Sequence, residues 1–283
     1  MQYNLTIVIP SLNEEWLGET LKDVLKNSNE ETEIIVMLDG WIPDYELPKS
    51  KRLKVIQLKE TQGQRRAQNL GVKESNAEFV MKLDSHVSMS KDFDKIMIGI
   101  MKENPNIVLV PSFTNLWVYN WVCPKGHRTY QGKVDKCGQC EETKLEKELV
   151  WQNNTKIYSD FKFSEDLIFE YGDLENYEML HEVKAIQGSG IMVSKENYFK
   201  WQLCDESWGS WGQAGVEMAI KVWNNGSKIM CTRRAFMGHF FRKENEFPYL
   251  RDMKSVDENY NRSKLLAKEN AEIIKIKTGI IIE

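Results

Sequence analysis

An aspartate and a histidine separated by one residue are the side chains of this sequence best suited to binding a divalent cation. Asp84 and His86 follow the apolar run Glu78–Leu83, which predicts a β-strand. Side chains at positions i and i+2 of an extended chain share a face, so both can reach one ion. A carboxylate with an imidazole suits Mn²⁺, or Mg²⁺ in its place, and leaves positions open for the oxygens of a departing diphosphate. The alternative is a turn, in which Asp84 caps a helix beginning near Lys91.

A second group of metal-binding residues contains three of the five cysteines. The four candidate ligands are Cys123, His127, Cys137 and Cys140. They can close a tetrahedral Cys₃His zinc site, in which metal binding replaces the core that so short a segment lacks. Because protein fills all four positions, this zinc is predicted to be structural. The alternative is that the thiols are free on the surface.

Basic and aromatic residues accompany these cysteines. This combination suits a nucleic acid chain as well as a carbohydrate, and the alternative is a solvated zinc ribbon packed by its own aromatic side chains. The residues are Lys125, Arg128, Lys133 and Lys136 beside Trp117, Tyr119 and Trp121.

Elements that would position these ligands alternate in the rhythm of βαβ units. Apolar runs predict strands at residues 5–9, 33–38, 53–58, 78–83 and 107–110, and helical spacing predicts helices at 14–26, 63–74 and 91–103. We therefore expect an α/β fold with a mostly parallel sheet flanked by helices. Ligands of such sheets lie beyond the carboxyl ends of the strands, so Pro10–Glu14, Asp39 and Asp84–His86 should line one crevice.

Residues from about 112 to about 171 interrupt this rhythm, and we interpret the interruption as an insertion. The rhythm resumes with an apolar run at 186–193, a helix over 215–223, a strand at 228–231 and a terminal helix over about 258–275. One catalytic unit carrying an insertion is the expected organisation.

Composition narrows the class of protein. The chain has 283 residues, 38 basic and 42 acidic, with a net charge of -4 and a pI near 5.8, which argues against a surface built to neutralise nucleic acid phosphates. It has no run of 18 apolar residues and no signal-peptide pattern at its start, so we expect a cytoplasmic protein without a membrane span. The odd number of cysteines fits a metal site and two buried thiols in a reducing compartment.

Six segments in order carry a resemblance to a known family. They are residues 7–15, 63–71, 83–86, 188–199, 211–223 and 238–243. Together they resemble glycosyltransferases of the GT-A type, and within these the polypeptide N-acetylgalactosaminyltransferases. Leu83–His86 is identical to the variant of the Asp-x-Asp motif in those relatives.

The resemblance implies a role for residues along the whole chain. His239 would join Asp84 and His86 on the metal, whereas by itself it could be a core histidine. Glu217 and Trp211 would act in catalysis, Glu217 by orienting groups or stabilising positive charge on the sugar while the departing phosphate takes the proton of the acceptor. Each also has a structural alternative, such as an exposed helix face for Glu217. The residues implied to bind the donor are Pro10, Ser11, Glu14, Asp39, Arg66, Asp84 and Gly190.

The implied activity is metal-dependent transfer of a hexose or N-acetylhexosamine from a nucleotide donor, with UDP as the nucleotide and with retention of configuration. Residues 1–112 would form the nucleotide-sugar-binding half, 113–150 the zinc-ribbon insertion, and 151–283 the acceptor half with the C-terminal helix. Ala214 and Gly215 replace a glutamate and an asparagine of the relatives, so the sugar need not be N-acetylgalactosamine.

The acceptor stays open between a protein, a glycan and a modified DNA base in the cytoplasm, with the insertion forming part of its site. Two other classes compete with this assignment. A nucleotidyltransferase would need a first loop rich in glycine and lysine, which Pro10–Glu14 is not. A zinc-ribbon protein that binds nucleic acid without catalysis is the remaining alternative.

Overall fold

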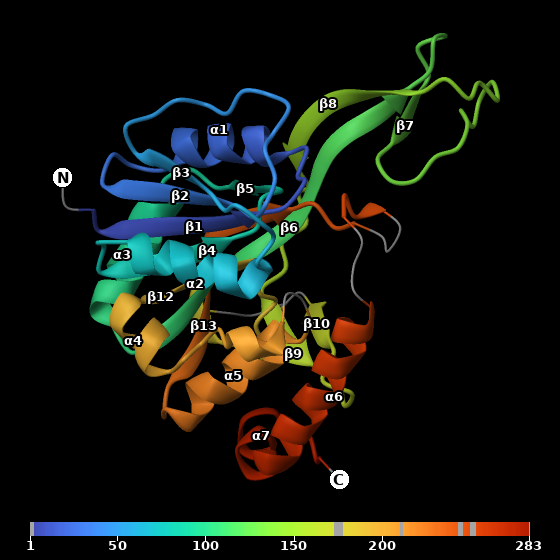
Figure 1. Ribbon diagram of the computed structural model, residues 1–283. Helices are drawn as coiled ribbons and strands as arrows, with labels where there is room; N and C mark the ends of the chain where they lie inside the picture. Colours follow the sequence, from blue (N-terminus) through green and yellow to red (C-terminus); the bar gives the residue numbers. More distant parts are fainter. Residues whose placement is uncertain (1–2, 173–177, 210–211, 243–245, 250–252, 283) are drawn as a thin grey trace.

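The computed structural model describes residues 3–172, 178–209, 212–242, 246–249 and 253–282 (Figure 1). Its centre is a large mixed sheet with the strand order β11-β13-β6-β12-β4-β1-β2-β3. The parallel part consists of β1 (Leu5–Ser11), β2 (Thr32–Leu38), β3 (Leu53–Gln57) and β4 (Phe79–Leu83). Side chains of β1, β2 and β4 are buried almost throughout, as expected of strands with helices on both faces.

Three helices connect these strands. α1 (Leu17–Asn27) leads from β1 to β2, α2 (Gln64–Glu74) from β3 to β4, and α3 (Phe93–Glu103) from the short β5 (Val87–Met89) to β6. The crossovers through α1 and α2 move across the sheet in opposite directions, so their right-handed connections place the two helices on opposite faces. These elements agree with the predicted α/β rhythm to within a few residues.

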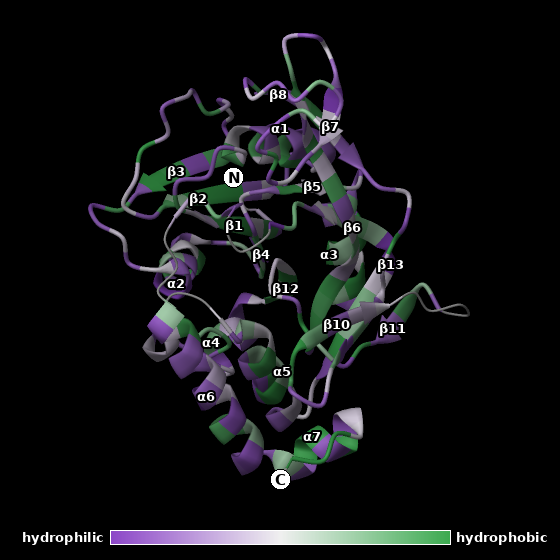
Figure 2. Cartoon of the chain, turned by 90° about the vertical axis from the view of Figure 1, so that its right-hand side faces the viewer, coloured by the Kyte–Doolittle hydropathy of each residue, from purple (hydrophilic) through white to green (hydrophobic). Residues whose placement is uncertain are grey.

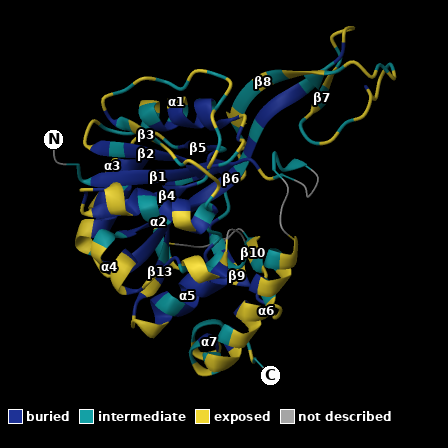
Figure 3. Cartoon of the chain, viewed as in Figure 1, coloured by how far each residue is buried: buried dark blue, intermediate teal, exposed yellow. Residues whose placement is uncertain are grey.

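The second half of the sheet is mixed. β12 (Gly190–Ser194) runs antiparallel to β4, β13 (Lys228–His239) runs parallel to β6 and antiparallel to β5, and β11 (Leu180–Glu182) forms the edge. α4 (Lys195–Lys200), the short 3₁₀ helix η1 (Glu206–Trp208) and α5 (Ala214–Asn224) pack beside it. The apolar strands and the buried inner faces of the helices form one continuous core (Figures 2 and 3).

β6 (Ile107–Val122) is far longer than the predicted strand, and it runs through the boundary expected at residue 112 without a break. Its first part pairs with β13, as far as Asn115 opposite His239. Its second part pairs with β7 (Arg128–Tyr130) and β8 (Glu146–Asn153) and projects from the body. We call residues 116–153 the arm (Figure 1).

Two further parts complete the chain. A two-stranded sheet of β9 (Asp160–Phe163) and β10 (Phe169–Gly172) follows the arm. The predicted terminal helix is two helices, α6 (Met253–Glu269) and α7 (Ala271–Thr278), which both contact α5. No helix in the described part of the chain is long and apolar enough to span a membrane.

Candidate active site

Three candidate metal ligands from distant parts of the chain meet at the carboxyl end of β4. Asp84 and His86 lie between β4 and β5, and His239 is the last residue of β13, which pairs with β5 through His239 and Val87. Nε2 of His239 lies 3.2 Å from Oδ2 of Asp84. One ligand atom from each of the three side chains lies within 4.8 Å of the others, a spacing that one ion can bridge.

The chemistry of this triad fits a divalent cation. Burial lowers the pKa of His239 to about 4, so its imidazole is neutral at physiological pH and keeps a lone pair. Nδ1 of the same ring is buried without a hydrogen-bond partner among the described residues. Burial alone would raise the pKa of Asp84, but the Lys82 ammonium and His239 outweigh it, and the carboxyl group stays ionised.

Glu14 and Arg242 orient the second histidine. Oε2 of Glu14 lies 2.9 Å from Nδ1 of His86, and Nη2 of Arg242 donates to Oε1 of Glu14 at 2.5 Å. Burial by itself would raise the pKa of Glu14, but the neighbouring His86 and Arg242 have the larger effect and lower it. The carboxylate is therefore ionised and can only accept hydrogen bonds. Nη1 of Arg242 also lies 3.1 Å from Nδ1 of His86, so this nitrogen has an acceptor and a donor beside it, and the two side chains together hold the ring in place.

The triad lies in a cavity of about 960 Å³, a volume in the range of small-molecule sites. Pro10, Ser11, Glu14 and Asp39 line it together with the triad, so the carboxyl ends of β1, β2 and β4 meet there as predicted. The buried Oγ of Ser11 has no partner among the described residues, so a bound ligand could supply one.

Asp39 is held by the loop before α2. Its carboxylate accepts from the backbone N–H groups of Gln62, at 2.6 Å, and Gly63, at 2.9 Å. Gly63 precedes α2 with φ +89, a left-handed conformation that glycine adopts without strain. Asp39 thus shapes the cavity through the backbone of this loop.

Arg65, and not Arg66, is the arginine of α2 that lines the cavity. Arg66 points to solvent, whereas the side chain of Arg65 is 3% exposed and forms an ion pair with Glu217 of α5. Glu217 is completely buried and also accepts from Nζ of Lys221, at 2.5 Å, and from the backbone N–H of Asp205, at 3.0 Å. It is not among the cavity-lining residues. The structure therefore places Glu217 beneath the site, as an anchor for α2, η1 and α5.

Two other predicted site residues, Gly190 and Trp211, are not part of the described cavity wall. Gly190 does not line the cavity, but a Cβ there would lie 2.8 Å from Sδ of Met237, so glycine leaves room for this side chain of β13. Gly188 and Ser189 line the cavity instead. Trp211 lies outside the described residues.

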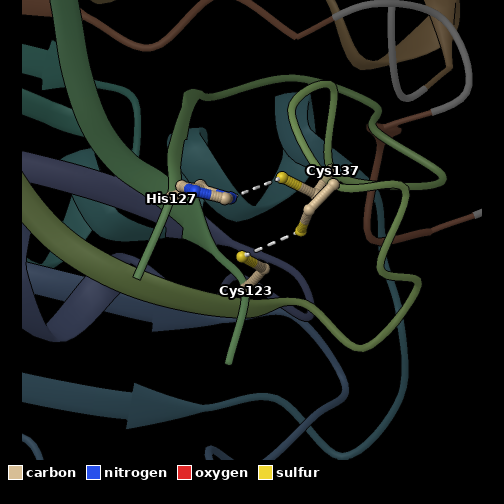
Figure 4. Close-up of side chains that lie close together, drawn as sticks. Cys123, His127 and Cys137 are labelled. Carbon is tan, nitrogen blue, oxygen red and sulfur yellow. Dashed lines mark hydrogen bonds between the residues drawn. The ribbon is translucent and has the colours of Figure 1, made fainter. Parts of the chain in front are cut away.

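Four side chains of the arm form the second candidate metal centre. Sγ of Cys123 lies 3.7 Å from Sγ of Cys140, and Sγ of Cys137 lies 3.6 Å from Nδ1 of His127 (Figure 4). A tetrahedron with Zn–S bonds of about 2.3 Å has edges of about 3.8 Å, which these distances match. Amide N–H donors, that of Gln139 first among them, lower the pKa of Cys137 to about 6, which favours the thiolate that a metal requires. All four predicted ligands therefore meet.

Sequence reasoning missed the roles of Lys82, Arg65 and Arg242. Lys82 could have been recognised as a charged residue inside an otherwise apolar strand. Arg242 could have been recognised because it lies in the last of the six segments that resemble the family. Nothing in the sequence distinguished Arg65 from its neighbour.

Comparison with known proteins defines the class of protein. The chain shares its fold with the crystal structure of GalNAc-T7 with UDP, GalNAc and Mn²⁺, at a TM-score of 0.65 and 17% identity over 93% of this chain and 47% of that one. The structure of TarS from S. aureus gives a TM-score of 0.52 and 14% identity over 95% of this chain and 39% of that one. With its α/β sheet, the protein is a glycosyltransferase with the GT-A fold.

The chain belongs to glycosyl transferase family 2, whose family model matches residues 6–156. It is 22% identical to the putative polypeptide N-acetylgalactosaminyltransferase 13 of Drosophila melanogaster, over 95% of this chain and 48% of the relative. It is 31% identical to the poly-beta-1,6-N-acetyl-D-glucosamine synthase of Staphylococcus epidermidis, over 36% of this chain and 26% of the relative. The chain thus spans less than half the length of these curated relatives.

Proposed function

We propose that the protein transfers a sugar from a uridine diphosphate donor with the help of Mn²⁺, or Mg²⁺, held by Asp84, His86 and His239. The observation that carries the proposal is the convergence of these side chains in one cavity, with a buried and unpartnered nitrogen on His239 among the described residues. The metal, when bound, supplies positive charge that stabilises the departing diphosphate. A neighbouring structure determined with UDP, GalNAc and Mn²⁺ supports this donor and this metal.

The residues around the triad have separate proposed roles. Glu14 and Arg242 hold the ring of His86 in the orientation in which it faces the other two ligands. Pro10 and Ser11 offer a surface to the nucleotide, and Asp39 holds the loop at Gly63 beside it. Arg66 has no part in this proposal, because its side chain is exposed and does not line the cavity.

Retention of the anomeric configuration is the stereochemical outcome that we propose. Carboxylates of Glu14, Asp39, Asp84 and Asp257 line the described part of the cavity, and the first three are engaged by partners. The departing phosphate would then take the proton of the acceptor. Product analysis by NMR tests this proposal. A product with inverted anomeric configuration would contradict retention, and loss of that product in Asp257→Asn would identify Asp257 as the catalytic base of an inverting reaction.

The acceptor that we propose is a hydroxyl group of a protein or a glycan. Between residues 123 and 146 the arm has five basic and four acidic residues, and Arg128 and Lys136 form ion pairs with Glu148 and Glu141. A surface with nearly equal numbers of positive and negative charges does not favour binding of a nucleic acid chain. It therefore argues against a DNA base as the acceptor and against a module that only binds nucleic acid.

The arm is proposed to belong to the acceptor site. A smaller cavity of about 200 Å³ between arm and body is lined by Tyr119, Trp121, Lys147 and Arg242, and Arg242 also lines the main cavity. Replacing residues 124–145 by a short turn would leave the pairing of β6 with β8 intact as far as Val122 and Glu146. Unchanged acceptor selectivity of that variant would contradict a role for the end of the arm, which contributes Gly132 and Lys133 to this cavity.

A structural zinc ion at Cys123, His127, Cys137 and Cys140 is part of the proposal. It rests on the four ligand atoms within 4.8 Å of one another. With four protein ligands such an ion has no open position for substrate, so it would hold the end of the arm together.

The binding of nucleotides tests the central proposal. We expect UDP at a hundred times its Kd with Mn²⁺ to stabilise the protein by about 2.7 kcal/mol and to raise Tm by roughly 5–10 °C, with no rise when a chelator replaces Mn²⁺. His239→Ala should abolish the shift, and His181→Ala, on the distant edge strand β11, should retain it. Equal stabilisation with chelator, or none with any nucleotide and metal, would contradict the proposal.

A further inference from the structure

Lys82 is a buried lysine that points into the main cavity from the middle of a strand. It lies on β4 two residues before Asp84, its side chain is 5% exposed, and it lines the cavity. Nζ forms an ion pair with Oδ1 of Asp84 and donates to the carbonyl oxygen of Gly188 at 2.7 Å. Removing an ammonium group from water costs several kcal/mol unless partners compensate, so its position requires an explanation.

Holding the backbone together does not explain it. The segment at Gly188 is already fixed beside β4, because the N–H of Asp84 donates to the carbonyl oxygen of Ser189 at 2.9 Å and Gly190 pairs with Leu83. An ammonium group has three N–H donors, and only two meet an acceptor among the described residues. One donor of Lys82 is therefore available to a ligand in the cavity.

The charges of the site indicate which ligand it suits. Glu14 is balanced by Arg242, and Asp84 is balanced by Lys82. Lys82 and Arg242 thus bring two positive charges to the triad, and an ion bound there would add two more beside the carboxylates of Glu14 and Asp84. The charge of Lys82 thus prepares the cavity for an anionic group in addition to compensating Asp84.

We propose that Lys82 is a donor-binding residue whose ammonium binds an oxyanion of the nucleotide sugar. This inference rests on the proposed donor and metal. Two groups offer the same chemistry: a diphosphate oxygen, and the carboxylate of a uronic acid sugar. Ala214 and Gly215 line the same cavity as Gly188 and Ser189 and carry no charge that would oppose a sugar carboxylate.

Donor affinities of Lys82→Met and Lys82→Arg test the proposal. Calorimetry with Mn²⁺ would compare UDP, UDP-glucose, UDP-N-acetylgalactosamine, UDP-glucuronic acid and UDP-galacturonic acid. Loss of a charged hydrogen bond should weaken binding to Lys82→Met about ten- to a hundredfold, while Lys82→Arg keeps most of the affinity. An equal loss for UDP and every donor identifies the diphosphate, and a loss confined to the uronic acid donors identifies the carboxylate. Lys54→Met, which removes an exposed lysine of β3, is the matched control.

Two results would overturn the role of Lys82. One is a Lys82→Met protein with a lower Tm and unchanged affinity for every donor, since Lys82 would then only support the fold. The other is a loss of Mn²⁺ affinity, measured without nucleotide by electron paramagnetic resonance, because Lys82 would then act only through Asp84. If the wild-type protein itself binds no UDP with Mn²⁺, the proposed function fails first, and the two failures are thereby distinguished.

Discussion

Glu217 offers the sharpest test of how the site is supported. Its carboxylate is completely buried and accepts from Arg65, Lys221 and the N–H of Asp205. Glu217→Gln removes the charge and leaves the guanidinium of Arg65, 3% exposed, without its counter-charge. Breaking a buried ion pair from one side costs about 3–5 kcal/mol. For a domain of this size, that corresponds to a fall in Tm of roughly 6–20 °C.

Thermal and denaturant unfolding measure this loss, and a double variant separates the causes. In Arg65→Met/Glu217→Met both charges are replaced by apolar side chains, so the double variant should be more stable than either single variant. At a temperature where Glu217→Gln is folded, we expect it to bind Mn²⁺ and UDP nearly as the wild-type protein does, because Glu217 does not line the cavity. A Glu217→Gln protein with wild-type Tm and a large loss of turnover would refute this reasoning and restore the catalytic role that the family resemblance implies.

Two further predictions concern the metal centres. Glu14→Gln should weaken Mn²⁺ binding about ten- to a hundredfold, because His86 loses the carboxylate that holds its ring in place. Glu15→Gln, at the exposed neighbouring residue, is the control, and equal affinities of the two variants would contradict this account. Cys137→Ser should reduce the zinc content, measured by mass spectrometry, from about one ion per chain and should make the arm sensitive to proteolysis. Cys231→Ser, at a buried cysteine of β13 outside the arm, is the control and should retain the metal. A wild-type protein purified without zinc would refute the site.

Local patterns were enough to predict most of the sheet and its helices, and they grouped all the candidate metal ligands except His239. The spacing of apolar residues within each segment indicates whether that segment forms a strand or a helix. Asp84 and His86 are neighbours in sequence, and the four ligands of the arm lie within 18 residues, so spacing alone could group them. His239 was added by resemblance only.

β6 shows where a local pattern misled the prediction. Pro111 interrupts the apolar run, and a proline cannot donate a hydrogen bond to a neighbouring strand. β13 accommodates it by a register shift between Thr232 and Phe236, after which its pairing with β6 resumes. The register shift that accommodates Pro111 lies in a strand more than 100 residues away in the sequence, so a local sequence pattern could not predict it.

Contacts between distant elements decided how the cavity is built. Arg65 and Arg66 are equivalent in composition, but adjacent helix positions point in directions about 100° apart, and only the packing of α2 shows which one faces inward. In the same way, Glu14 meets Arg242 across 228 positions, and Glu217 meets Arg65 across 152. The sequence determined which elements form and which residues are candidate metal ligands. Burial and long-range pairing determined which charged groups face the cavity, because these depend on neighbours that the chain brings together only on folding.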